Sequence, residues 1–597
     1  MTVARTTRER AERAVWRRWR WALATALAVV VAGALWAGWT VWQVQRDLTA
    51  ARAQAVALPA ALAGDGDGAT AAVDALQSHA GAAADRTSGP TWQVLSALPA
   101  LGDDFDATAR VSRAVDIVAR DGAGPLVGSG LSAATFAPRD GRLPVERVAR
   151  AAAPLAEARD GFVEAQAELE DIRLDGLVRE LRPQLEALIR EVDEGVSTLD
   201  GATRAAEVLP AMLGRDGARD YLLVFQNNAE PRSLGGMPGL MAPLRADRGT
   251  VMLGGTVAAS EFGELDRPVL PLTEQERAIW FDQPGTYFQD AVFIPDFERA
   301  SELMAARWKL ETGQDVDGVL SVDPVALSYL LKATGPITVD GRRLTSSTFV
   351  DEILHEPYLR YQDDPAAEDA FFAEVLTTTF DRLLDPRTSP SALVSALSRG
   401  ATEGRLLVHS AKSQEQDRLD GTRVAGAFPT ESGGAAQAGV YVNDATGSKM
   451  GYFLDYDARI SSVSCAGGVI GFSGSLRIHS TAPADAASLP PTVTGPGTYG
   501  VARGDHLNVF DLVAPAGGKI TDVVVNGVKS TGTNRTFEGR PIVSVPILLE
   551  PGDVVTLTWR ATSGEGHSGG VELISTPGVQ RGGGKQFVPA PCAGGEQ

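Results

Sequence analysis

A run of five apolar residues, Tyr221 to Phe225, constrains the possible fold of this chain more than any other stretch does. Such a run is typical of a strand that is covered on both faces of a sheet. Amides, an acid, an arginine and paired glycines follow it directly. Since polar clusters at the carboxyl ends of strands are the usual sites of α/β domains, we expect a binding site here. Its candidate residues are Asn227, Asn228, Glu230, Arg232, Gly235 and Gly236.

The length of the chain, 597 residues, predicts several domains. The formal net charge is −20, but seven arginines and two glutamates in residues 1–20 give +5 there and leave −25 for the rest. An acidic body repels phosphate backbones, so nucleic acid is not an expected partner.

Residues 21–44 contain no formally charged side chain. As a helix they would extend roughly 36 Å, enough to cross a hydrocarbon core of about 30 Å. The basic residues 1–20 before them predict a cytoplasmic N-terminus and an outward-facing main body in the cell membrane. A cleaved signal peptide is the rival interpretation, but its apolar region is normally only about 7–15 residues long. We therefore expect a single-pass signal anchor.

Three further parts are expected after this anchor. Residues 45–214 are rich in alanine, leucine and charge, and the apolar spacing from Leu174 to Leu199 predicts an amphipathic helix that Pro183 kinks. We expect a helical bundle or stalk there. Residues 215–420 alternate strand and helix patterns, which predicts an α/β sandwich, and in it Asp323-Pro324 opens a helix. Residues 421–597 predict an all-β sandwich.

The two cysteines, Cys465 and Cys592, do not form a C-x-x-C pattern. A disulfide between them is the simplest use in an oxidising compartment. The six histidines are dispersed, which favours no zinc site.

Three stretches resemble the bacterial domain-of-unknown-function family 4012, which is common in actinobacteria. They are Trp92 to Gly102, Gln226-Asn-Asn-Ala-Glu-Pro-Arg-Ser-Leu-Gly-Gly236 and Asn443-Asp-Ala-Thr-Gly-Ser-Lys-Met450. The resemblance implies a single-pass protein of the cell envelope or cell wall, and it implies no activity.

The central part also resembles the LytR-CpsA-Psr phosphotransferases, through the order of strand, Arg232 loop, helix and the stretch from Val316 to Val339. Those enzymes transfer glycopolymers from polyprenyl pyrophosphate carriers, and they hold the pyrophosphate with arginines, an acid and a divalent cation. The resemblance implies Arg232 and Arg360 as ligand-binding residues and a divalent cation as the one cofactor. The second arginine motif is absent, because Gly255-Thr-Val-Ala-Ala-Ser260 stands in its place, and Ala366 to Phe372 replaces an Arg-Gln helix.

Each candidate also has a structural interpretation. Arg232 fits an ion pair with Glu230 or another acid as well as it fits a ligand. Asp323 is a candidate metal ligand, although a solvated turn residue is the more common use of such an acid. Lys449 fits a site or, more simply, a turn that connects two strands.

Three functions follow from these observations. The first is an envelope protein whose α/β domain binds an anionic lipid-linked or cell-wall glycan. The second is a diverged phosphotransferase that acts on polyprenyl pyrophosphate carriers. The third is a scaffold or adhesion protein with no ligand in the α/β domain.

Overall fold

The computed structural model describes residues 3–62, 67–99, 101–131, 136–139, 141–385, 387–429, 435–497, 500–567, 569–580 and 584–590. The chain divides into two compact units. Unit 1 comprises Met1–Thr135 and Arg147–Glu207, and unit 2 comprises Phe136–Glu146 and Val208–Gln597.

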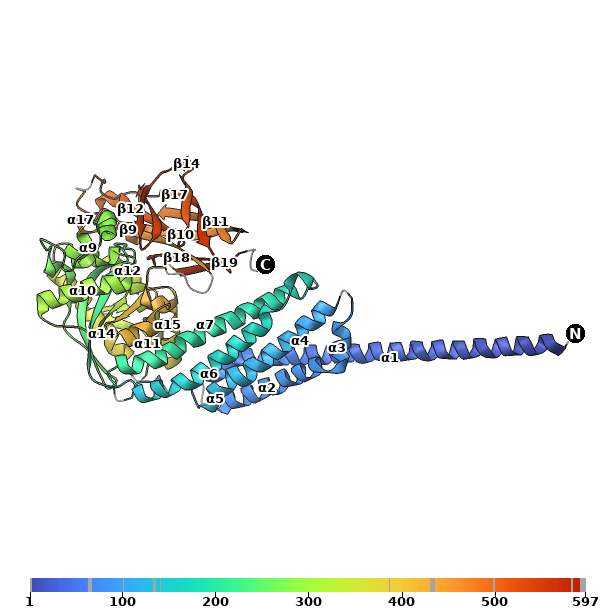
Figure 1. The fold of residues 1–597 in the computed structure, drawn as a ribbon. Helices are drawn as coiled ribbons and strands as arrows, with labels where there is room; N and C mark the ends of the chain where they lie inside the picture. The colour runs from blue at the N-terminus through green and yellow to red at the C-terminus, as the bar shows by residue number, and fades with distance from the viewer. Residues whose placement is uncertain are drawn as a thin grey trace. The chain divides into compact units, whose positions relative to one another are not determined.

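Unit 1 is a bundle of helices (Figure 1). Small buried alanines, such as Ala51, Ala80 and Ala119, lie at the seams and let the helices approach closely. The helices that contribute to it are α1 (Val3–Leu62), α2 (Asp67–Ser88), α3 (Pro90–Ser96), α4 (Gly102–Ile117), the π-helical turn η1 (Val118–Ala123), α5 (Gly124–Gly128), α6 (Val145–Glu170) and α7 (Arg182–Met212).

The predicted transmembrane helix over residues 21–44 is wrong. Among the residues that the structure describes, no helix has both the length and the apolar character that a membrane crossing requires. The end of the predicted span packs inside unit 1, where Val44, 1% exposed, contacts Trp92 and Ala109. Trp36 Nε1 also donates a hydrogen bond to Thr91 Oγ1 over 3.2 Å. At this end Val41 and Val44 therefore lie in a seam between helices, whereas Trp39 and Trp42 are exposed. The side chains of the basic segment, residues 1–20, lie outside the described part of the structure.

The predicted kink at Pro183 is also wrong. Leu174–Gly176 forms a separate short turn, and α7 starts only at Arg182. Pro183 therefore lies in the first turn of α7, where the missing amide hydrogen costs no helical hydrogen bond.

The first half of unit 2 is built on a mixed sheet with the strand order β3-β2-β1-β5-β8, in which β4 also pairs with β2. The pair β1/β5 is parallel, whereas β1/β2 and β5/β8 are antiparallel. These strands are β1 (Arg219–Asn227), β2 (Met237–Asp247), β3 (Thr250–Leu253), β4 (Val257–Ala258), β5 (Gly318–Val322) and β8 (Leu406–Ser410), and β6 (Ile337–Val339) and β7 (Arg342–Leu344) form a separate hairpin.

Both faces of this sheet are covered, which confirms the prediction from Tyr221–Phe225. Leu222 and Val224 join one apolar cluster with α10, and Leu223 and Phe225 pack against a second cluster with α11, α14 and α15 (Figure 1). The helices of unit 2 are α8 (Glu274–Trp280), α9 (Gln283–Thr286), α10 (Phe297–Thr312), α11 (Pro324–Thr334), α12 (Phe349–Leu354), α13 (Glu356–Arg360), α14 (Pro365–Leu383), α15 (Pro390–Thr402), α16 (Ser413–Leu419) and α17 (Pro491–Thr494).

The second half of unit 2 contains two sheets, with the orders β10-β11-β17-β13-β14 and β15-β16-β12-β9-β18-β19, which share one large apolar core. Tyr441 and Phe537 from this half also join the α10 cluster, so the two halves pack together. The strands are β9 (Ala436–Asp444), β10 (Leu454–Ala466), β11 (Val469–Ser480), β12 (His506–Val513), β13 (Lys519–Val525), β14 (Val528–Lys529), β15 (Thr533–Phe537), β16 (Arg540–Leu549), β17 (Val554–Glu565), β18 (Gly570–Ser575) and β19 (Gly584–Pro589).

Cys465 lies in β10 and is disulfide-bonded. Its predicted partner, Cys592, lies outside the described residues. The pairing of these two cysteines therefore stays a prediction.

Candidate functional site

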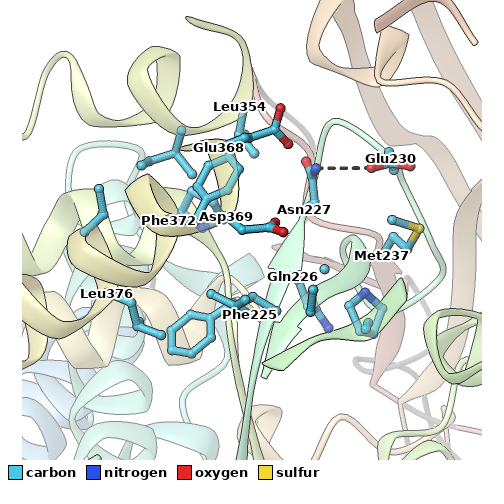
Figure 2. A pocket seen from close by; sticks show the side chains of 18 of the residues that line it. Phe225, Gln226, Asn227, Glu230, Met237, Leu354, Glu368, Asp369, Phe372 and Leu376 are labelled. Atoms are coloured by element: carbon cyan, nitrogen blue, oxygen red, sulfur yellow. Dashed lines mark hydrogen bonds between the residues drawn. The ribbon is translucent and has the colours of Figure 1, made fainter. Parts of the chain in front are cut away.

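A pocket of about 260 Å³ opens at the carboxyl end of β1, within unit 2. Figure 2 shows it between the end of β1, which carries Phe225, Gln226 and Asn227, and helix α14. This is the edge of the sheet at which the sequence predicts a site.

A β-bulge in β2 gives this pocket its floor. Phe225 pairs with Leu240 and Gln226 pairs with Pro238, so Gly239 is the extra residue of the bulge. Bulges break the alternation of side chains and are common beside functional sites. Consequently, four consecutive residues of β2, Met237, Pro238, Gly239 and Leu240, all line the pocket.

Helix α14 supplies the apolar wall opposite. Asp364 caps it by accepting a hydrogen bond from the Ala367 amide over 3.1 Å. Phe372, Val375 and Leu376 follow at spacings of three and four, so they share the face that lines the pocket. The wall continues through α12, from which Phe349, Ile353 and Leu354 also line the pocket.

A chain of polar contacts closes one side of the pocket. Asn227 Nδ2 donates to Glu230 Oε1 over 3.2 Å and to the Tyr358 hydroxyl over 3.0 Å. Lys449 Nζ lies 3.0 Å from Glu230 Oε1 and 4.7 Å from the centre of the Tyr358 ring. Burial lowers the pKa of Lys449, but the Glu230 carboxylate and Tyr358 outweigh it and raise that pKa in total. Lys449 is thus a protonated, neutralised member of the pocket lining.

Two more carboxylates, Glu368 and Asp369, line the pocket from the start of α14, with Glu368 in the first turn. Within the described part of the chain, neither has an ion pair or a side-chain hydrogen bond. Burial raises the pKa of Glu368, and Lys449 opposes this shift. Burial and the charge of Glu261 raise the pKa of Asp369. Figure 2 shows both on the side of α14 that faces the end of β1.

Gln226 is a third polar group without a partner. It is only 4% exposed and lines the pocket, yet its Nε2 atom makes no hydrogen bond with any described residue. A buried amide without a partner costs about 1–3 kcal/mol, so an acceptor that reached this nitrogen would be stabilised by it.

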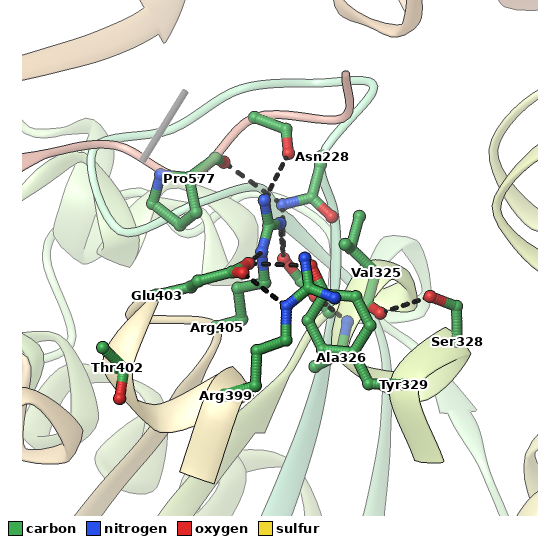
Figure 3. Close-up of polar contacts among 12 residues, drawn as sticks. Asn228, Val325, Ala326, Ser328, Tyr329, Arg399, Thr402, Glu403, Arg405 and Pro577 are labelled. Atoms are coloured by element: carbon green, nitrogen blue, oxygen red, sulfur yellow. Dashed lines mark hydrogen bonds and ion pairs between the residues drawn. The ribbon is translucent and has the colours of Figure 1, made fainter. Parts of the chain in front are cut away.

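Only some of the site residues that the sequence predicts lie at the pocket. Asn227 and Glu230 line the pocket, whereas Asn228 lies away from it and donates from Nδ2 to Asp323 Oδ2 over 3.1 Å. Asn228 and Asp323 belong to a buried network around Arg405, whose Nη1 lies 2.7 Å from Asp323 Oδ2 (Figure 3).

Asp323 has a structural use. Its Oδ1 accepts the Ala326 amide over 2.7 Å, which caps α11 as the Asp323-Pro324 pattern predicts, and its Oδ2 faces Arg405. Both oxygens thus face nitrogen donors, which a metal ligand would not. In the described ranges, no group of three or more His, Cys, Asp or Glu side chains is arranged to hold a metal ion.

Neither predicted arginine lines the pocket. Arg232 Nε and Nη2 both lie 3.3 Å from Asp290 Oδ1, and its guanidinium stacks 4.5 Å from the centre of Phe293. Arg360 Nη2 donates to Glu352 Oε2 over 2.9 Å. The acid that pairs with Arg232 is therefore Asp290, and Glu230 pairs with Lys449 instead.

Gly235 and Gly236 shape the turn back into β2. Gly235 has φ +127°, which favours glycine. A Cβ at Gly236 would lie 2.4 Å from the backbone carbonyl of Asn227. The two glycines thus permit this tight turn, and neither lines the pocket.

Sequence reasoning missed Gln226, Tyr358, Glu368 and Asp369 as pocket residues. A signal existed for the two acids, because Ala366 to Phe372 carries them where the phosphotransferase resemblance expects a basic helix. Tyr358 lies 131 positions from Asn227, so only the fold reveals their contact.

Searches of curated proteins and of solved structures find no match to this chain. Residues 216–358 match the model of the family described as "Protein of unknown function (DUF4012)". The match runs from the start of β1 to Tyr358, and it includes Gln226, Asn227 and Glu230 of the pocket. This segment, which carries the strand and the floor of the pocket, is thus the part of the chain that is similar to the DUF4012 family.

Proposed function

We propose that unit 2 binds an amphipathic envelope molecule and holds its apolar chain in the pocket between β1 and α14. The apolar wall of Phe372, Val375 and Leu376, opposite Phe225, is the observation that carries the proposal. Removing apolar surface from water contributes about 25 cal/mol per Å², so a hydrocarbon chain gains free energy in such a pocket.

A lipid-linked glycan remains the ligand class, because it joins an apolar chain to a polar head. Its expected anionic character loses support, since Arg232 already pairs with Asp290. The phosphotransferase alternative has no observation in its favour, because Arg232 and Arg360 lie in separate ion pairs outside the pocket lining.

The proposal places this binding outside the cytoplasm. The disulfide at Cys465 supports that location, since disulfides persist mainly in oxidising compartments.

The test is calorimetric titration of the full chain with dodecyl maltoside below its micelle-forming concentration. An added Cβ at Gly239 meets no atom within 4 Å, so Gly239→Phe can fold and narrow the pocket. Gly255→Phe is the matched control, because its Cβ is equally unobstructed and it lies outside the pocket lining.

We expect binding by the unaltered chain and by the Gly255→Phe variant, and a loss of at least tenfold in affinity in the Gly239→Phe variant. If none of the three proteins binds the detergent, the result favours the scaffold interpretation instead. Equal binding by all three proteins would place the detergent elsewhere and refute the pocket.

A further inference from the structure

We propose that the pocket selects a head group that carries a protonated amine beside a hydroxyl or carbonyl oxygen, as in an amino sugar. This inference deepens the proposed function and rests on it. It concerns only the polar end of the ligand.

The charges that line the pocket are unbalanced. Glu230, Glu368 and Asp369 are acidic, and Lys449 is the one cation among the lining residues. Lys449 is already neutralised by Glu230 at 3.0 Å. The lining therefore carries an uncompensated charge of −2 when Glu368 and Asp369 are ionised.

An anionic head would meet this charge with repulsion, whereas a cation would offset it. Glu368 is half-buried, and the one cation that acts on it among the described residues is the already neutralised Lys449. A bound ammonium group could donate a hydrogen bond to either carboxylate, and charge-assisted bonds of this type are about twice as strong as neutral ones. Cation-binding pockets gain affinity in the same way, because an opposite charge at short range favours the charged form of a group.

The amide of Gln226 requires a hydrogen-bond acceptor on the ligand, which the two acids do not require. Its Nε2 atom is buried and has no acceptor among the described residues, and Gln226 itself is one of the residues that line the pocket. An oxygen on the ligand would satisfy this donor. A simple alkylamine would fill the acidic positions alone, whereas an amino sugar supplies both the nitrogen and neighbouring oxygens.

The aromatic ring of Tyr358 has a matching position. It is 5% exposed, lines the same side of the pocket and already lies against the Lys449 ammonium. The pocket thus already holds one ammonium group between a carboxylate and an aromatic ring, which is the arrangement that we propose for the ligand.

The test uses ligands that have different head groups and the same dodecyl tail. Dodecyl maltoside, dodecylamine, dodecyl phosphate and a dodecyl glycoside of glucosamine are titrated into the full chain below their micelle-forming concentrations. Glu368→Gln with Asp369→Asn removes the charges at nearly constant shape, and Gln226→Leu removes the amide. Glu374→Gln is the control, because Glu374 is exposed on the same helix and does not line the pocket.

We expect the glucosamine and amine ligands to bind at least tenfold more tightly than dodecyl phosphate. The double carboxylate variant should reduce this preference to about threefold or less, and Glu374→Gln should preserve it. Gln226→Leu should weaken the glucosamine ligand several-fold and leave dodecylamine unchanged.

Two outcomes separate the proposals. If every dodecyl ligand binds and dodecyl phosphate binds as tightly as the amines, the head-group inference fails while the proposed function stands. If no dodecyl ligand binds, both fail. A preference for amines that survives the double carboxylate variant would also overturn the inference, because it would not arise from Glu368 and Asp369.

Discussion

Arg405 Nη1 and Asp323 Oδ2 form a 2.7 Å ion pair whose side chains are 5% and 0% exposed. The pair joins the start of β8 to the cap of α11, and Arg405 Nη2 also donates to the Gly578 carbonyl over 3.0 Å. It thereby ties the α/β half of unit 2 to the segment that follows β18.

Removal of this arginine should be costly. We expect Arg405→Met to lower the free energy of unfolding of unit 2 by about 3–5 kcal/mol, because Asp323 would stay buried without its cation. Native-state hydrogen exchange of the β5 and β8 amides measures this locally. The control is Arg459→Met, which removes a 2.6 Å pair between side chains that are 70% and 45% exposed. Exposed pairs contribute less than about 1 kcal/mol, so similar losses in the two variants would contradict the argument.

Gly236 should not accept a side chain. Gly236→Ala places a Cβ 2.4 Å from the Asn227 carbonyl, which should cost about 1–3 kcal/mol through backbone displacement. Gly239→Ala lies in the same turn-and-strand segment and meets no atom within 4 Å, so it should change stability by less than about 0.5 kcal/mol. Denaturant unfolding followed by hydrogen exchange in β1 and β2 compares the two. A stable Gly236→Ala protein would show that the turn can relax.

Asp511 should make unit 2 less stable as the pH rises. Burial raises its pKa from 3.8 to about 6, although Ser544 and Asn443 donate hydrogen bonds to it. The folded state thus binds this proton more tightly than the unfolded state, so the free energy of unfolding falls between about pH 4 and pH 6. A shift of this size corresponds to at most about 3 kcal/mol.

The measurement is the pH dependence of stability for the unaltered chain minus that of Asp511→Asn. The difference cancels the contribution of His506. Burial lowers the pKa of His506 to about 4, so its effect on stability has the opposite sign over the same pH range. Asp485→Asn, at an exposed position, should leave the slope unchanged. An equal slope with and without Asp511 would exclude it as the source.

Val44 tests the role of the helix that was expected to cross a membrane. Val44→Asp should lower the stability of unit 1 by more than about 3 kcal/mol, because a carboxylate would replace a side chain that is 1% exposed between Trp92 and Ala109. Val56→Asp is the control on the same helix, since Val56 is 74% exposed. Hydrogen exchange of the α3 and α4 amides is the readout. Unchanged protection in Val44→Asp would mean that this seam does not hold the bundle together.

The strand and helix starts around the site follow from local sequence. Tyr221 to Phe225 lies within β1, and Gly318 to Val322 is β5. Asp323 caps α11 through the Ala326 amide, as the Asp-Pro pattern predicts. Each of these outcomes depends on residues within four positions, where propensity and capping chemistry act directly.

The membership of the pocket does not follow from local sequence. Glu230 pairs with Lys449, which lies in the loop after β9, and Asn227 contacts Tyr358 on α13. The Gly239 bulge in β2 brings the consecutive residues 237–240 to the same cavity, contrary to the alternation of an ordinary strand.

By itself, the sequence determined where strands, caps and tight turns lie, since these depend on backbone chemistry and near neighbours. Only the tertiary structure decided that Val44 faces a helix seam, that Arg232 pairs with Asp290 and that Glu368 and Asp369 face Gln226 across a pocket. The physical reason is that an apolar or charged side chain has the same intrinsic preference wherever it stands. Its partner is chosen by which distant elements the fold brings within contact distance.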